Sequence, residues 1–171
     1  SDLQPAAPVL TVNNAVISWT AEEDAAYEVK VGGGEWMANT TGSVDATAFT
    51  ETTEVAVRVK VNGVYSDPAT QTITVVTLEK PVITESEGVL HYAVANGNAY
   101  EVTLNGATTQ EGASVAKANT VGNYSYTVKA IGYASGAIVY LTSEASEVYT
   151  FTVALSAPVL TVNNAVISWT V

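Results

Sequence analysis

The sequence contains no cysteine and only one histidine, His91. Without cysteine the chain has no disulfide framework, no thiolate metal ligand and no cysteine nucleophile. A single histidine cannot form a multi-histidine metal site, and strand alternation places His91 opposite Tyr92, on a face turned to solvent or to a domain interface. We therefore predict no catalytic residue, no metal site, no cofactor and no enzymatic activity.

Positive charge is also scarce, because 6 Lys and Arg stand against 17 Asp and Glu and give a net charge of −11. Nucleic acid backbones and anionic membrane surfaces repel such a chain. No apolar run reaches the ~18 residues of a membrane-spanning helix, and no signal peptide is recognisable. We expect a mature chain or a fragment, with no nucleic-acid partner and no membrane insertion.

Carboxylates are densest at residues 22–24 and at Glu85 and Glu87. Calcium requires about six to eight oxygen ligands in a set geometry, and neither run has the Asp-x-Asp-x-Asp-Gly spacing of a dedicated loop. We interpret both as solvated loops, with a calcium ion at a domain junction as the alternative.

What the sequence does contain is a β composition, rich in Val, Thr, Tyr and Ile, and an internal repeat. The fourteen residues 7–20, APVLTVNNAVISWT, return unchanged at residues 157–170. They predict a strand, a tight turn centred on Asn13-Asn14, and a second strand. In the second strand Ala15, Ile17 and Trp19 share one face, so we predict that Trp19 anchors a core.

A weaker repeat divides the chain between these copies into two related domains. The stretches that begin at Pro8 and Tyr27 correspond to those that begin at Pro81 and Tyr100, and residues 55–61 correspond to residues 124–130. We predict a tail at 1–6, domains at 7–77 and 78–154, and at 155–171 a linker with the start of a third repeat. Short strands separated by turns, without helical periodicity, indicate β-sandwiches or barrels.

The inward faces of the sheets follow from period-two alternation. The predicted inward residues are Tyr27, Val29, Val31, Val55, Val57, Val59 and Val61 in the first domain, and Tyr100, Val102, Leu104, Tyr124, Tyr126, Val128 and Ala130 in the second.

These motifs resemble fibronectin type III repeats, a branch of the immunoglobulin-like sandwiches. The resemblance is carried by the leading prolines, by the aromatic late in the second strand (Trp19, Tyr92), by the Tyr-x-Val strands and by the strand that begins at Tyr124. It implies an all-β fold of two tandem fibronectin type III-like sandwiches plus the first hairpin of a third repeat. It also implies a tyrosine corner at Tyr124, which the first domain lacks because Val55 stands at that position.

Family members act mostly as spacers, adhesion surfaces or accessory modules of extracellular enzymes. The resemblance therefore implies a non-catalytic spacer or adhesion module pair from a repeat-containing, secreted or cell-surface bacterial protein. Its partners would be neighbouring domains of the same polypeptide. Residues 76–80 are too short and too apolar for a floppy linker, so we expect restricted bending.

The alternative is a carbohydrate- or protein-binding accessory module. Trp36 follows a glycine-rich turn, where an exposed indole can stack on a sugar or on an apolar partner, unless it only covers the sandwich edge with Met37. Tyr133 and Tyr140 flank residues 135–137 in the predicted F–G loop, where related folds often bind ligands.

The repeated segment at the end of the chain predicts self-association. Residues 157–170 place Val159, Ile167 and Trp169 in a hairpin without a sandwich of its own. Because the segment equals residues 7–20, it could replace that hairpin in a neighbouring molecule and give a strand-swapped dimer or chain. The alternative is that it docks on the second domain or frays.

Overall fold

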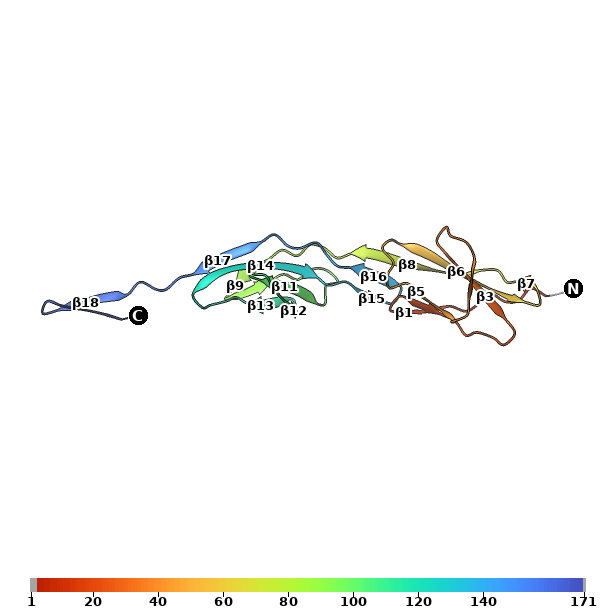
Figure 1. Cartoon of the computed structure of the whole chain (residues 1–171), viewed down its shortest axis with the longest axis horizontal. Coiled ribbons are helices and arrows are strands. Elements are labelled where there is room, and N and C mark those ends of the chain that lie inside the picture. The colour runs from red at the N-terminus through yellow and green to blue at the C-terminus, as the bar shows by residue number, and fades with distance from the viewer. Residues whose placement is uncertain (1–2, 171) are drawn as a thin grey trace.

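A computed structural model describes residues 3–170 of the chain. Its secondary structure consists of strands, which form two successive sandwiches and a separate C-terminal hairpin along one axis (Figure 1). The two ends of the described chain lie far apart, and the two sandwiches are arranged end to end.

The first sandwich has one three-stranded and one larger sheet. The small sheet has the order β1-β2-β5, and the larger sheet contains the path β8-β6-β3-β4, with β7 paired to β6. The strands are β1 (Thr11–Asn13), β2 (Val16–Ser18), β3 (Ala26–Val31), β4 (Met37–Asn39), β5 (Ser43–Asp45), β6 (Thr53–Val61), β7 (Val64–Tyr65) and β8 (Ala69–Thr77).

The second sandwich repeats this plan. Its sheets have the orders β9-β10-β13 and β12-β11-β14-β17. The strands are β9 (Thr84–Ser86), β10 (Val89–His91), β11 (Tyr100–Leu104), β12 (Ala107–Glu111), β13 (Ser114–Ala116), β14 (Gly122–Ala130) and β17 (Tyr149–Val153). Two packed sheets of three and four strands, repeated once, confirm the predicted tandem fibronectin type III-like fold. The boundaries at 77 and 154 and the bacterial origin stay predictions.

Each sandwich has a core of its own. Trp19 is 7% exposed and packs against Tyr27 in the first core, as its strand position predicts. Tyr92 and Tyr100 occupy the same places in the second core, with ring centroids 5.2 Å apart. His91 is exposed, as predicted from its place beside Tyr92.

Two local predictions are wrong. Val31 is 42% exposed instead of facing the core, because β3 ends there and Gly32 turns the chain away. The first hairpin turn is centred on Asn14 and Ala15, both with positive φ, rather than on Asn13 and Asn14. Asn13 pairs with Val16 and so still belongs to the strand.

The tyrosine corner is confirmed. The hydroxyl of Tyr124 donates a 2.8 Å hydrogen bond to the backbone oxygen of Thr120, four residues upstream. Val55, which stands at the corresponding position in the first sandwich, is fully buried and has no hydroxyl to offer.

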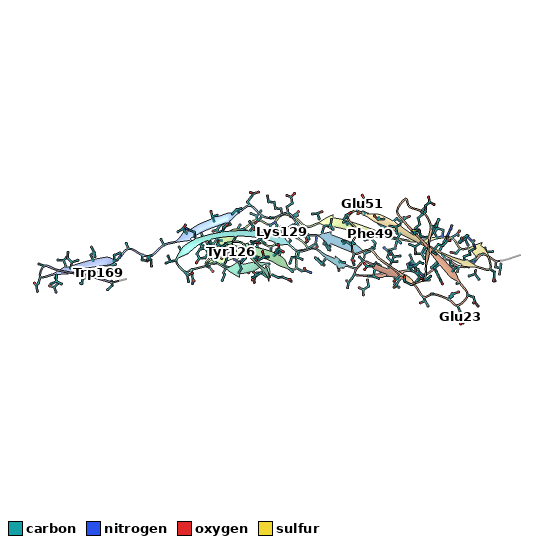
Figure 2. All side chains as sticks on the ribbon, in the orientation of Figure 1. Glu23, Phe49, Glu51, Tyr126, Lys129 and Trp169 are labelled. Atoms are coloured by element: carbon teal, nitrogen blue, oxygen red, sulfur yellow. The ribbon has the colours of Figure 1, made fainter. Side chains whose placement is uncertain are left out.

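The identical copy of the first hairpin lies alone at the end of the molecule. Its strands β18 (Val159–Asn163) and β19 (Val166–Thr170) pair only with one another among the described residues. Trp169 lies in this isolated segment, well away from both sandwiches (Figure 2).

Candidate functional site at the joint between the sandwiches

The two sandwiches differ most between their last two large strands. A buried serine closes this segment in each: Ser66 accepts a hydrogen bond from the Val59 amide, and Ser146 accepts one from the Val128 amide. These pairs are 7 and 18 residues apart, so the second sandwich carries 11 more residues here (18 − 7). The longer segment forms a hairpin of β15 (Tyr133–Ser135) and β16 (Ile138–Leu141).

This hairpin leaves its own sandwich and joins the sheet of the other one. β16 pairs in parallel with β8, from Ile138 opposite Thr74 to Leu141 opposite Thr77. Figure 1 shows β16 beside β8, with β15 on the other side of β16, where the two sandwiches meet. The larger sheet of the first sandwich is thereby extended to the order β15-β16-β8-β6-β3-β4.

Backbone hydrogen bonds fix the hairpin on both sheets of the first sandwich. The amides of Thr74 and Leu78 donate to the carbonyls of Ala137 and Leu141 at 2.9 and 3.0 Å. At the hairpin tip, the carbonyl of Gly136 accepts a 2.8 Å hydrogen bond from the Ala15 amide, which lies in the turn between β1 and β2. Residues of the interdomain connection therefore belong to a ladder and not to a free linker.

The apolar side of the hairpin completes the first core. Val139 is 3% exposed and belongs to the same buried cluster as Ile17, Val57 and Ile73. Ala134, Ala137 and Leu141 pack around that cluster. The first sandwich thus buries a residue that the second one supplies.

The base of the hairpin is anchored in the second sandwich. Tyr133 stacks on Tyr140 with ring centroids 4.8 Å apart, and its hydroxyl donates to the carbonyl of Asn96 at 2.8 Å. A Cβ on Gly132, the residue before Tyr133, would come within 2.4 Å of the Tyr140 carbonyl oxygen. The two tyrosines therefore have a structural place at the joint, and ligand binding by them stays a prediction.

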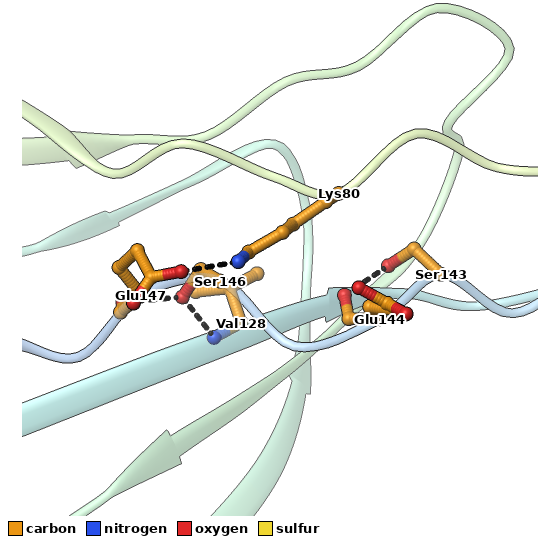
Figure 3. A network of polar contacts seen from close by, with 6 residues as sticks. All are labelled: Lys80, Val128, Ser143, Glu144, Ser146 and Glu147. Atoms are coloured by element: carbon orange, nitrogen blue, oxygen red, sulfur yellow. Dashed lines mark hydrogen bonds and ion pairs between the residues drawn. The ribbon is translucent and has the colours of Figure 1, made fainter.

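Buried serines hold the strand that carries the hairpin (Figure 3). The amides of Val128 and Ala130 donate to the hydroxyls of Ser146 and Ser143 at 3.0 and 2.8 Å. Each hydroxyl in turn donates to the carbonyl of the residue that follows it. β17 pairs with β14 only as far as Tyr126. Beyond that residue the two serines supply the partners of the buried β14 amides.

An ion pair lies at the same end of the second sandwich. Lys80, just after the connection, contacts Glu147, which follows Ser146 (Figure 3). The hydrogen bond that the Lys80 ammonium donates to the Glu147 carboxylate is the main reason that the pKa of Lys80 lies above its ordinary value and the pKa of Glu147 below its own. The pair is exposed, so it contributes little to stability.

Trp36 belongs to a separate cluster on the outer face of the first sandwich. The Arg58 guanidinium lies 4.2 Å from the Trp36 ring centroid and 3.9 Å from that of Tyr65. Arg58 also donates to Glu28 at 2.7 Å. This bond, with a further one from Tyr65, holds the pKa of Glu28 below its ordinary value against the opposing effect of burial. Trp36 covers the sheet together with Arg58, while Met37 is 70% exposed.

The residues predicted for self-association are exposed in this chain. Val159, Ile167 and Trp169 have 65, 60 and 65% of their surface accessible. Neither docking on the second sandwich nor fraying of the hairpin describes them, since β18 and β19 are paired over five residues each. Their association with another molecule stays a prediction.

No three His, Asp or Glu residues within residues 3–170 lie close enough to hold a metal ion together. The same residues contain no helix that is long and apolar enough to cross a membrane.

Comparison with known proteins gives likenesses of fold only. No family model matches the sequence, and no curated protein matches it. Among solved structures, the chicken interferon gamma receptor alpha chain is 12% identical at a TM-score of 0.33, covering 90% of this chain and 99% of the receptor chain. The FN1–FN3 domains of chicken CNTN1 are 14% identical at 0.33, covering 88% of this chain and 68% of that one.

A BSP domain of a biofilm associated protein is also similar, with 15% identity and a TM-score of 0.33. The alignment covers 88% of this chain and 30% of that protein's chain. At such identities the function has to be argued from the residues of the chain itself.

Sequence reasoning missed the residues that build the joint. No functional role is predicted from the sequence for Val139, Gly132 or residues 74–78. Only restricted bending is expected, for residues 76–80. The available signal was the extra length between β14 and β17, together with an apolar run in residues 137–141 that a solvated loop does not require.

Proposed function

We propose that the chain is a stiff, non-catalytic spacer of an extracellular, repeat-containing bacterial protein, in which each two-domain unit adds a fixed length. The observation that carries this proposal is the parallel pairing of β16 with β8. Bending at the connection would break the hydrogen bonds of Thr74 and Leu78 and withdraw Val139 from the first core. An interface of this kind opposes the relative motion expected of two domains joined by a simple linker.

The surface chemistry agrees with a spacer. A net charge of −11 keeps such a chain soluble and disfavours close packing of neighbouring chains. Repetition of a folded unit lengthens a stalk without adding a binding site. Adhesion, if present, would then belong to other parts of the parent protein.

Small-angle X-ray scattering tests the stiffness. One variant replaces residues 131–143 by Asn-Gly, which gives the second sandwich the short connection that the first has at Asn62 and Gly63. A milder one, Val139→Asp, leaves the length unchanged. The wild type should scatter as a single rod, and both variants should give a broader distribution of interatomic distances. The control Val148→Asp changes a valine that is 60% exposed and should scatter as the wild type does.

A rod-like wild type that both hairpin variants match would refute the role of the hairpin. A wild type that already scatters as two freely jointed bodies would refute the spacer itself.

A second function rests on the cluster of Trp36, Arg58 and Tyr65. The Arg58 guanidinium over two aromatic rings, beside the exposed Met37, makes a surface of a kind that can stack on a sugar ring or an apolar protein patch. Tryptophan fluorescence during titration with glycans should change in the wild type and stay constant in Trp36→Phe. An unchanged wild-type signal with every glycan would remove this function and leave the spacer untouched.

A further inference from the structure

The structure contains one sequence in two environments. In the first hairpin, Ile17 is fully buried and Trp19 is 7% exposed, whereas Ile167 and Trp169 of the identical C-terminal hairpin are 60 and 65% exposed. The two hairpins have the same register, since Val12 pairs with Ile17 and Val162 with Ile167. Both have positive φ angles at the same Asn-Ala turn. The C-terminal copy therefore has the same hairpin conformation as the first copy, but its apolar face packs on nothing within residues 3–170.

The first copy defines that contact. Its apolar face lies on Val29, Val57 and Ile73, and its edge pairs with β5 from Val16 opposite Asp45 to Ser18 opposite Ser43. Further hydrogen bonds run from the Trp19 amide to the Gly42 carbonyl and from the Ala46 amide to the Ala15 carbonyl, at 3.1 and 2.9 Å. The corresponding edge of β19 is unpaired in the described chain.

We infer that the hairpin 157–170 can replace β1 and β2 in the first sandwich of a second copy of this chain whose own first hairpin has been displaced or damaged. Identity of sequence makes the two hairpins equal in shape and polarity, so a sandwich that accepts one accepts the other. Successive docking runs head to tail and does not close on itself, which gives chains of molecules rather than a symmetric dimer.

Docking requires that the first hairpin of the acceptor be displaced or weakened. Exchange between two intact molecules exposes one apolar face for each that it buries, and association also costs translational entropy. The intact chain is thus expected to stay monomeric. A molecule whose first hairpin is damaged gains the full burial of the donated one.

The identical hairpins supply matched variants of the full chain. Ile17→Asn damages the first hairpin, Ile167→Asn damages the second, and the double variant damages both. Light-scattering mass and thermal unfolding are measured over a hundredfold range of concentration. Ile17→Asn should form multimers whose unfolding temperature rises with concentration, because association then stabilises the fold. The double variant should stay monomeric with an unfolded first sandwich, and Ile167→Asn should behave as the wild type.

Disulfide cross-linking reports the geometry even if Ile17→Asn aggregates. The Ser18–Ser43 pair lies next to the hydrogen-bonded pair of Trp19 and Gly42, so it is a close, non-hydrogen-bonded pair that suits a disulfide. In Ile17→Asn, cysteines at Ser43 and Ser168 should form disulfides between molecules. Moving the second cysteine to Thr161, which lies on the other strand of the hairpin, should abolish them.

Three results would overturn the inference. One is equal behaviour of Ile17→Asn and the double variant, and another is equal cross-linking through Ser168 and Thr161. The third is a wild-type dimer that Ile167→Asn dissociates, because the exposed face would then bind a surface other than an acceptor sandwich. The inference does not depend on the spacer function, since these readouts do not measure stiffness.

Discussion

Serine is the residue on which the last turn of each sandwich depends. The buried polar residues of the described chain are Ser66, Ser143 and Ser146, and the hydroxyl of each accepts a hydrogen bond from a buried strand amide. Their hydroxyls also donate to the carbonyl of the next residue, so one small side chain satisfies a buried amide and a partly buried carbonyl. Alanine has the right size for the same space but offers neither bond.

Ser146→Ala should therefore destabilise the second sandwich by about 1–3 kcal/mol, the cost of leaving the Val128 amide buried and unpaired. Urea unfolding measures this loss. Ser86→Ala, at an exposed position in β9, is the matched control and should change stability by less than about 0.5 kcal/mol. Equal stability of the two variants would mean that water replaces the hydroxyl.

Tyr124 offers a second test at this scale. Tyr124→Phe removes the hydroxyl that bonds to the Thr120 carbonyl and should cost about 0.5–1.5 kcal/mol. Tyr149 packs beside the same Phe151, and no hydrogen bond of its hydroxyl is found within residues 3–170. Tyr149→Phe should thus leave the urea midpoint unchanged, and a loss as large as that of Tyr124→Phe would show that the corner contributes nothing of its own.

The Glu28–Arg58 pair predicts a dependence of stability on pH. The pKa of Glu28 is lowered in the folded protein, chiefly by the hydrogen bond from Arg58, so the ionised form favours folding. This stabilisation is present above the unfolded pKa of 4.5 and is lost as the pH falls through the lower folded value. Glu28→Gln should lose stability at pH 7 and show a smaller further loss between pH 5 and pH 3.

Chemical denaturation across that range measures the slope for wild type and variant. Glu79→Gln is the control, because it removes one carboxylate from the same chain without touching Arg58. Parallel curves for wild type and Glu28→Gln would contradict the assigned role of the pair.

At the scale of elements, the hairpin β15–β16 serves a sandwich other than its own. Val139→Ala should reduce the stability of the first core by about 1–3 kcal/mol, since it removes buried methyl groups from the cluster around Ile17 and Ile73. The change should appear in the fluorescence transition of Trp19, which lies in the first core. Val148→Ala, at an exposed position of the second sandwich, should have no such effect.

Loss of stability confined to the second sandwich in Val139→Ala would contradict the position of the hairpin. Amide signals of the second sandwich, followed by NMR during the same titration, separate the two results.

The strands and their faces could be predicted from the sequence because alternation records which residues face a core. Tyr27, Val29 and Val57 are buried as expected. The tyrosine corner was implied by the resemblance of the strand that begins at Tyr124 to fibronectin type III repeats. Alternation does not record which sheet a strand joins. The apolar residues of β16 look the same whether they cover the second core or the first, and only the structure places Val139 in the first.

The three aromatic residues predicted to bind a ligand lie in two different clusters. The prediction rested on aromatic side chains near turns, namely Trp36, Tyr133 and Tyr140. A position near a turn does not indicate which of these side chains lie close to one another in the fold. Trp36 contacts Arg58 on an outer sheet face, while the two tyrosines stack on one another at the joint.

At the scale of the whole molecule, the connection between the sandwiches is a three-stranded ribbon. Residues 74–78 lie beside 137–141, and β15 lies on the far side of β16. Two cores that share strands in this way should unfold together more closely than two cores joined by a linker.

The most direct test of this joint is amide hydrogen exchange at Thr74, Leu78 and Ala15, whose N–H groups donate to carbonyls of the hairpin across the joint. We predict that all three exchange as slowly as the amides inside β6, and that Val139→Asp speeds them while leaving β6 itself protected. Exchange of these three amides in the wild type at the rate of an exposed peptide would mean that the hairpin is not held on the first sandwich, and that the two domains are hinged.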